Sequence, residues 1–528
     1  MKGATSWRRR AVIFGIPVVV VAAAAVVLAV LTIGDNDDHQ AAVQPKPARL
    51  VAPPRVARAP AKPAFPAAPA GQPQPAGSGA AIPLPTPTAD STWDKLVEKA
   101  KDEGSIPVII TLKQRIRPEG ALTTGQRRTQ RRQIDSVGDR VLDDVSGDVE
   151  HVDRFEAVPI VTLKATPEAL EQLRRSPDVI SVAEDVPVPL RPPPQTVPSQ
   201  AAQAARSWST GDQWWHLYKD ETNTAWSKGY DGTGQTVAVL DTGVQSDHPW
   251  LAGKVVSEAC FSSAGSCSGG VTVQYGTGSA APCTFVSVCG HGTHVAHDAA
   301  GKYGVARNAK IIALRVFSRS TQCSGGAAVC ASAYPSDQLK ALERVYQLRN
   351  TFRIAAVNIS IGGGKYTNYC DSPEDSYTYW LRTLQAVGIA TIIATGNEAF
   401  TDAVDWPGCH ASAIAAGGTS LDSNGSDAMY YYSNSSPQIF NLLAPGEYIC
   451  SAWPTSTTSC GNGTSYATPQ ITGAFATLRQ LKPTASITSI RNSIICSGGA
   501  IRDRSGVARA RLRVWSALIA LYNNKTTC

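Results

Sequence analysis

The chain has 528 residues, of which 43% are hydrophobic and 17% are charged, and its formal net charge is +7. This length predicts more than one domain, and the composition excludes a wholly disordered chain. The positive charge is modest and partly concentrated in two arginine clusters, within residues 8–10 and 127–132. It therefore argues against nucleic acid as a partner.

The first element along the chain is an uncharged apolar run over Ala11–Ile33, which is long enough to cross a bilayer as a helix. Three arginines precede it, so residues 1–10 are expected in the cytoplasm and the rest of the chain outside. We expect residues 11–33 to be the uncleaved transmembrane signal-anchor of a single-pass membrane protein. The alternative is a cleaved signal peptide and a secreted protein, although the apolar core of such a signal is normally only about 7–15 residues.

Residues 34–90 are rich in Ala and Pro and are expected to form a disordered linker, because they bury too little apolar surface to fold. From 91 to 191 the pattern changes to that of a small α+β domain of the ferredoxin-like type. A polar, arginine-rich helix is expected over Gly125–Val145, and a second helix begins after Thr166, which a proline follows. Strands are expected over Ile106–Leu112, Val158–Leu163 and Val179–Ala183.

A second linker, residues 192–206, leads to a domain over 207–528 in which apolar runs alternate with helical stretches. This alternation predicts an α/β fold with a doubly wound parallel sheet. In such sheets the functional groups lie at the carboxyl ends of the strands. The expected strands are Thr236–Leu240, Ile311–Val316, Ile354–Ser360 and Ile389–Ala394, and the expected helices are Asp337–Arg349 and Pro373–Ala386.

All 12 cysteines lie between Cys260 and Cys528, and none has the spacing of a zinc site. An even number of cysteines confined to one domain indicates disulfides formed in an oxidising compartment. Sequence does not determine their connectivity, but proximity favours four short loops and leaves two longer closures. The pairs expected on this basis are Cys260–Cys267, Cys283–Cys289, Cys323–Cys330, Cys450–Cys460, Cys370–Cys409 and Cys496–Cys528.

Three short segments of the second domain carry the groups that nucleophilic catalysis needs. Asp241 ends an apolar strand in AVLDTG, His291 stands in GHGTHVA at the start of an expected helix, and Ser465 stands in GTSYATP. A serine hydroxyl becomes a good nucleophile beside a base, which a histidine supplies, and a buried carboxylate orients that histidine. Each residue alone has an ordinary structural explanation. Together the three motifs resemble the catalytic triad of the subtilase family of serine proteases.

The resemblance covers about four fifths of the chain and implies further site residues. Asn397, in ATGN after an apolar strand, matches the asparagine that stabilises the oxyanion in this family. The segment with Ser360, Ile361 and Gly362 resembles the edge on which a substrate peptide adds as an extra strand. The insert over Ser318–Tyr334 is expected to shape the other side of the cleft.

Asp405, in DWPG, aligns near the floor of the pocket that receives the P1 side chain, the residue immediately before the cleaved bond. A carboxylate at this position predicts a preference for Arg or Lys at P1. Asp402 is the alternative if the alignment slips.

The chain departs from the family at three positions near the triad. Tyr466 stands where methionine usually follows the nucleophile, and His297 and Asp298 stand where Gly and Thr are usual. A divalent ion at His297 and Asp298 is a hypothesis that lacks a third ligand, and His294 is interpreted as support for His291. The family needs no organic cofactor. Structural calcium is common in it, but the sequence shows no distinct ligand cluster.

Residues 91–191, with FEAVPIVTLKATPEALEQL and VISVAEDVP, resemble the inhibitory propeptide of subtilases. The resemblance implies a zymogen that carries its own intramolecular inhibitor and matures in the second linker, where we favour Arg206–Ser207. The expected function is a membrane-anchored, extracytoplasmic endopeptidase that acts on proteins and peptides. An inactive, surface-displayed binding module with the same fold is the alternative from another class.

Overall fold

The computed structural model describes residues 81–145, 149–191, 214–323, 326–372, 375–422 and 425–528. The expected signal-anchor at 11–33, most of the linker at 34–90 and the Arg206–Ser207 junction lie outside the described residues. Among the helices that are described, none combines the length and apolarity needed to cross a membrane.

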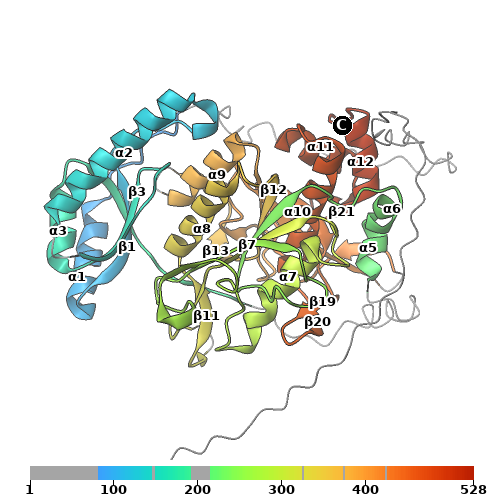
Figure 1. Cartoon of the computed structure of the whole chain (residues 1–528), viewed down its shortest axis with the longest axis horizontal. Coiled ribbons are helices and arrows are strands. Elements are labelled where there is room, and N and C mark those ends of the chain that lie inside the picture. Colours follow the sequence, from blue (N-terminus) through green and yellow to red (C-terminus); the bar gives the residue numbers. More distant parts are fainter. Residues whose placement is uncertain (1–80, 146–148, 192–213, 324–325, 373–374, 423–424) are drawn as a thin grey trace, which may run out of the picture. The chain divides into compact units, whose positions relative to one another are not determined.

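We call the described residues from 81 to 191 the N-terminal unit. It contains a four-stranded antiparallel sheet with the strand order β2-β3-β1-β4 (Figure 1). Apolar side chains from one face of this sheet and from its helices form a separate core. The helices are α1 (Asp90–Glu103), α2 (Thr124–Asp144) and α3 (Pro167–Arg175), with a short 3-10 turn, η1 (Glu119–Ala121). The strands are β1 (Ile106–Leu112), β2 (Val149–Arg154), β3 (Ile160–Ala165) and β4 (Val179–Glu184).

Local sequence signals determine the helix starts in this unit. The Thr166 side chain accepts a hydrogen bond from the Ala169 N–H and caps α3, and Pro167 occupies its first turn, as expected. Strand β2 was not expected from the sequence, because its residues are largely exposed and show no apolar alternation. The packed chain also begins earlier than residue 91, since Ile82 is fully buried.

The second unit is built on an 11-stranded sheet, in which the strands from β7 to β18 run parallel in the order β7-β9-β6-β12-β14-β16-β18. Strand β22 continues the parallel order beside β18, whereas β8, β17 and β21 pair antiparallel, so the sheet is mixed rather than wholly parallel. The strands of the sheet are β6 (Thr236–Asp241), β7 (Val255–Phe261), β8 (Val273–Tyr275), β9 (Lys310–Arg315), β12 (Ile354–Ile359), β14 (Ala390–Ala394), β16 (Ile414–Leu421), β17 (Asp427–Met429), β18 (Asn441–Pro445), β21 (Gly499–Arg502) and β22 (Ala508–Arg511).

Helices cover both faces of this sheet, as the side chains that alternate between the two faces of β6 show. Val237 and Val239 face a cluster with α7 and α10, whereas Ala238 and Leu240 face a cluster with α8 and α9. Strands buried on both faces read as continuous apolar runs, which explains why β6, β9, β12 and β14 were expected from the sequence. Strands β7, β16 and β18 of the parallel core were not expected. The helices are α5 (Trp215–Lys219), α6 (Thr222–Ser227), α7 (His291–Ala300), α8 (Pro335–Leu348), α9 (Ser376–Ala386), α10 (Thr464–Leu481), α11 (Ile487–Ser497) and α12 (Val514–Tyr522).

Three smaller sheets complete the fold. One has the order β10-β11-β5, and the other two are the pairs β13-β15 and β19-β20. Their strands are β5 (Val188–Pro189), β10 (Phe317–Ser320), β11 (Cys330–Ala333), β13 (Gly363–Tyr366), β15 (Val404–Trp406), β19 (Ile449–Trp453) and β20 (Thr457–Gly461).

All 12 cysteines form disulfides, and the six pairs are those expected from proximity in the sequence. Cys323–Cys330 closes the tip of the β10–β11 hairpin, which is the insert expected beside the cleft. Cys450–Cys460 joins directly opposed residues of β19 and β20. The disulfides therefore hold surface loops of a domain whose core is already large.

Candidate active site

The carboxyl ends of β6, β12 and β14 bring the expected catalytic residues to one edge of the sheet. Asp241 is the last residue of β6 and is buried, and His291 is the first residue of α7. His291 Nδ1 lies 2.9 and 3.0 Å from the two carboxylate oxygens of Asp241. A carboxylate at this distance fixes Nδ1 as the protonated ring nitrogen and leaves Nε2 to accept a proton.

The glycines of GHGTH permit the close packing that places His291. A Cβ on Gly292 would lie 2.3 Å from the Gly243 carbonyl oxygen, and one on Gly290 would lie 2.3 Å from the Trp453 ring. The start of α7 therefore touches the end of β6 backbone to backbone, which no larger residue allows.

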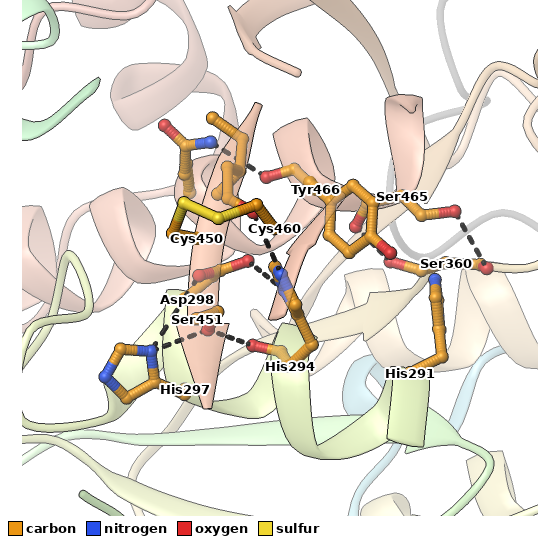
Figure 2. Close-up of polar contacts among 12 residues, drawn as sticks. His291, His294, His297, Asp298, Ser360, Cys450, Ser451, Cys460, Ser465 and Tyr466 are labelled. Carbon is orange, nitrogen blue, oxygen red and sulfur yellow. Dashed lines mark hydrogen bonds and ion pairs between the residues drawn. A yellow bond between two sulfur atoms is a disulfide. The ribbon is translucent and has the colours of Figure 1, made fainter. Parts of the chain in front are cut away.

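Ser465 lies in the first turn of α10 and is only 9% exposed. Its Oγ donates to the Ser360 carbonyl at 3.5 Å, and Ser360 Oγ donates back to the Ser465 carbonyl at 2.9 Å (Figure 2). Among the described residues, the Ser465 hydroxyl makes no hydrogen bond to His291. Catalytic hydrogen bonds are often long or unformed without substrate, so this geometry is compatible with the expected role of Ser465.

Asn397 follows β14 and its amide has a defined orientation. Its Oδ1 accepts from the Thr464 N–H at 2.9 Å and from Thr464 Oγ1 at 3.2 Å. Because the oxygen faces these donors, the Asn397 NH2 group points the other way, and in the described part of the chain it has no hydrogen-bond acceptor. The residue before the nucleophile thus orients a free donor at the site.

The chain itself occupies the side of the site where substrate was expected. Strand β5 pairs antiparallel with β11, with Val188 opposite Ala333, and the Leu190 N–H donates to the Ala331 carbonyl at 2.8 Å. On the other side, a Cβ on Gly363 would lie 3.2 Å from Val188. The segment that ends the N-terminal unit therefore runs between the insert hairpin and the chain that follows β12.

The expected edge residues have distinct environments. Ile361 is buried in the core beside α8 and α9, and Ser360 bonds to Ser465 as described. A Cβ on Gly362 would lie 3.0 Å from Asp405. Gly362 therefore leaves room for the carboxyl group expected at the pocket floor.

Asp405 lies in β15, is buried, and shares its surroundings with a second carboxyl group that sequence reasoning missed, that of Glu398. The Asn434 amide donates both to Asp405 Oδ1 at 3.1 Å and to Glu398 Oε2 at 2.7 Å. Burial raises the pKa of Asp405 to about 9, and Glu398 adds to this effect, whereas the Arg191 guanidinium opposes it. Asp405 is therefore protonated near neutral pH.

Glu398 also joins this pair to the catalytic edge, because its Oε2 accepts from the Asn397 backbone N–H at 2.8 Å. Its only sequence signal was its place directly after Asn397. The alternative pocket residue, Asp402, instead forms an ion pair with Lys365 at 3.0 Å, in which both side chains are about half exposed.

His294 and the two unusual residues of α7 form a buried polar network behind His291 (Figure 2). His294 Nδ1 lies 2.9 Å from Asp298 Oδ2, and His297 Nδ1 lies 2.7 Å from Ser451 Oγ. The one described set of three or more His, Cys, Asp or Glu side chains that converges on a point is Cys370, Cys409 and His410, whose cysteines form a disulfide. Among the described residues, no group of three His, Cys, Asp or Glu side chains therefore converges at Asp298.

Comparison with known proteins follows this geometry. A model of the Subtilase family matches residues 232–509. An alkaline protease of Alkalihalobacillus alcalophilus is 28% identical over 353 residues, which are 66% of this chain and 76% of the relative. Subtilisin Savinase of Lederbergia lenta is 29% identical over 286 residues (53% and 89%), and thermitase of Thermoactinomyces vulgaris is 30% identical over 257 residues (48% and 78%).

The family model spans more than half of the chain, so this chain belongs to the subtilase family. It is a subtilisin-like serine endopeptidase with the α/β fold of that family, and its chemistry requires no organic cofactor. Its six disulfides indicate a protein of an oxidising compartment outside the cytoplasm.

Proposed function

We propose that this endopeptidase cleaves peptide bonds through an acyl-enzyme on Ser465, with His291 as the base and Asp241 as the group that orients it. The observation that carries the proposal is the Asp241–His291 pair beside the first turn of α10. In the reaction, His291 Nε2 takes the Ser465 proton as Oγ attacks the substrate carbonyl carbon. Asp241 remains ionised and stabilises the imidazolium that forms.

The negative oxygen of the tetrahedral intermediate needs donors that are already in place. The Asn397 NH2 group and the backbone N–H of Ser465 supply them at the start of α10. His291 then gives its proton to the departing amine, and a water attacks the acyl-enzyme with His291 again as base.

Wild type and Ser465→Ala distinguish this mechanism from an inactive binding module. We expect a fluorophosphonate probe to label the wild type at Ser465 and the wild type to cleave peptides, with both signals absent from the variant. If the wild type neither takes the label nor cleaves peptides after its N-terminal unit has been removed, the binding module would be favoured.

We further propose that residues 91–191 are an inhibitory propeptide and that the chain is made as a zymogen. Support comes from β5, which lies along β11 in the manner of a bound substrate strand. Contacts of the unit with α8 add to it: Tyr346 donates to Glu119 at 2.5 Å, and the Ser336 N–H donates to Asp185 at 3.0 Å. Pro192 follows Arg191, so we place maturation further along the linker, at Arg206–Ser207.

We propose a basic P1 residue for the substrate, on the basis of the Glu398–Asp405 pair. Arg191 ends the strand-like segment, and its charge acts on Asp405. A cationic side chain in this position would favour the ionised form of the pair.

The pH dependence of inhibition follows from two acids where the N-terminal unit meets α8, the buried Asp185 and the half-buried Glu343. Burial raises the pKa of Asp185 to about 7, and burial raises the pKa of Glu343 to about 7 as well. When the N-terminal unit dissociates from α8, we expect Asp185 and Glu343 to reach solvent and their pKa values to return to about 4. The complex therefore binds more protons than its parts, so its stability is full below about pH 4 and falls as the pH rises to about 7.

We expect the affinity of the cleaved N-terminal unit for the peptidase domain to fall at least about tenfold between pH 5 and pH 8. Size-exclusion chromatography of Ser465→Ala, cut in the 192–206 linker by an added protease, measures this. Charged neighbours at this contact are Arg131, His151, Asp153, Glu156, Lys164, Asp337 and Lys340. Asp185→Asn with Glu343→Gln should flatten the profile, and an unchanged profile would assign it to those neighbours instead.

We propose a single-pass membrane location, on the basis of the apolar run at 11–33. The full-length chain should then sediment with membranes and resist extraction at high pH. A mature N-terminus just after this run, found in the medium, would identify the secreted alternative.

A further inference from the structure

A second imidazole–carboxylate pair lies behind the catalytic one on the same helix. His291, His294 and Asp298 are spaced by three and four residues, so they share one face of α7. His294 Nδ1 lies 2.9 Å from Asp298 Oδ2, and both side chains are at most 1% exposed. Figure 2 shows this pair next to His291 and below Tyr466.

Hydrogen-bond chemistry determines the number of protons in this pair. His294 Nε2 lies 3.1 Å from the Ile449 carbonyl oxygen, which only accepts, so Nε2 carries a proton. The contact between Nδ1 and the carboxyl group needs one more proton. Burial opposes ionisation of Asp298, but the adjacent His294 ring holds the pKa of this carboxyl group well below the usual range. A carboxylate and a carbonyl oxygen only accept, so both ring nitrogens of His294 donate, one to Asp298 and one to Ile449.

His297 does not share this charge. Ser451 Oγ donates its single proton to the His294 carbonyl at 2.9 Å, so it accepts from His297 Nδ1. Burial lowers the pKa of His297, and its ring packs against Trp214 and Trp250. A neutral His297 leaves Asp298 to stabilise the cation on His294.

The charged His294 ring contacts the residue that follows the nucleophile. The Tyr466 ring centroid is 4.2 Å from that of His294 and 5.6 Å from that of His291. A cation this close to an aromatic ring is attracted to it, most strongly where water is excluded. The opposite end of Tyr466 packs closely against Gly461, since a Cβ on Gly461 would lie 2.5 Å from the Tyr466 hydroxyl oxygen.

We propose that the Asp298–His294 ion pair holds the Tyr466 ring and thereby positions Ser465 against His291. His294 and Asp298 act on the reaction through Tyr466, so they are positioning residues rather than catalytic ones. The inference rests on the proposed role of Ser465 as nucleophile. It also gives a joint role to Tyr466 and Asp298, two positions at which the chain departs from its family.

Asp298→Asn tests the charge without removing the hydrogen bonds. The NH2 group of the introduced amide can donate to a neutral His294 Nδ1, while Nε2–H still donates to Ile449. We expect the second-order rate of fluorophosphonate labelling at Ser465 to fall about 3- to 30-fold, the size of one buried cation–ring interaction. The KM for a peptide substrate should change less than twofold, since the ion pair touches no substrate.

A double-mutant cycle with Tyr466→Leu separates positioning from general stability. If the ion pair acts through the ring, Asp298→Asn has little further effect once Tyr466 is replaced. Asp427→Asn is the matched control, because Asp427, which lies on β17, forms an ion pair with the buried Arg511 at 2.8 Å. This control should lower the melting temperature and leave the labelling rate unchanged.

The outcomes are distinct. An unlabelled wild type refutes the proposed function itself. A labelled wild type with an equally reactive Asp298→Asn variant refutes the positioning role. Additive losses in Asp298→Asn and Tyr466→Leu would assign the effect to general destabilisation and also overturn the proposal.

Discussion

Neutralising both carboxyl groups of the P1 pocket, in the double variant Asp405→Asn/Glu398→Gln, is expected to lower kcat/KM for P1-arginine peptides by about 10²- to 10³-fold. Loss of the partner of a buried charge commonly has an effect of this size. In the proposed pocket both acids share the Asn434 amide, and the charge of Arg191 acts on Asp405, so we expect it to hold one cation.

Each single substitution should lower kcat/KM for P1-arginine peptides by about tenfold or less. The pKa of Asp405, raised to about 9, indicates that this group is neutral near neutral pH. Asp405→Asn leaves the Glu398 carboxyl group in place, and Glu398→Gln removes a neighbour that raises the pKa of Asp405. The two single losses therefore do not add to the loss in the double variant.

Peptides with citrulline at P1 provide the control, because citrulline has the shape of arginine without its charge. The arginine-to-citrulline ratio of kcat/KM should rise from pH 6 to pH 9 in the wild type, because Asp405 ionises more readily as the pH rises and an ionised carboxylate favours the charged side chain. It should be near one in the double variant at every pH. A double variant that still prefers arginine would rule out this pair as the P1 determinant.

Asn397→Ala is expected to lower kcat by about 10²- to 10³-fold with little change in KM. Loss of the corresponding donor in subtilisin has an effect of this size, and the donor acts mainly on the transition state. The Asn397 NH2 group is directed away from Thr464, since its oxygen accepts from the Thr464 N–H at 2.9 Å.

Asn397→Asp separates the donor from that supporting contact. The aspartate keeps an oxygen for the Thr464 N–H but has no proton to give and adds a negative charge at the oxyanion. We expect it to be at least as inactive as Asn397→Ala. If steady-state kinetics instead show near wild-type activity for Asn397→Asp, the residue supports α10 and is not an oxyanion donor.

Local signals in the sequence were sufficient for much of this fold. The strands of the parallel core are buried on both faces, so they appear as uninterrupted apolar runs. Four of the six disulfides close loops of ten residues or fewer, and their partners were therefore near in sequence. Asp241, His291 and Ser465 were proposed as site residues because glycine-rich motifs surround each of them.

Features that depend on tertiary contacts were not predictable in this way. Glu398 becomes a pocket residue only because β15 places Asp405 beside it, 7 positions along the chain. The sequence showed the helical spacing of the Asp298–His294 pair. The second hydrogen bond of the His294 ring depends on the Ile449 carbonyl, which β19 brings from far along the chain. Strand β5 has two residues and pairs with an insert more than 140 positions away.

The most direct test of the account is the intact mass and N-terminal sequence of residues 41–528, as wild type and as Ser465→Ala. The account predicts that the wild type trims itself to a fragment that begins near Ser207, while the variant keeps its full length. A variant that trims itself as fast as the wild type, in the absence of any other protease, would contradict Ser465 as the nucleophile.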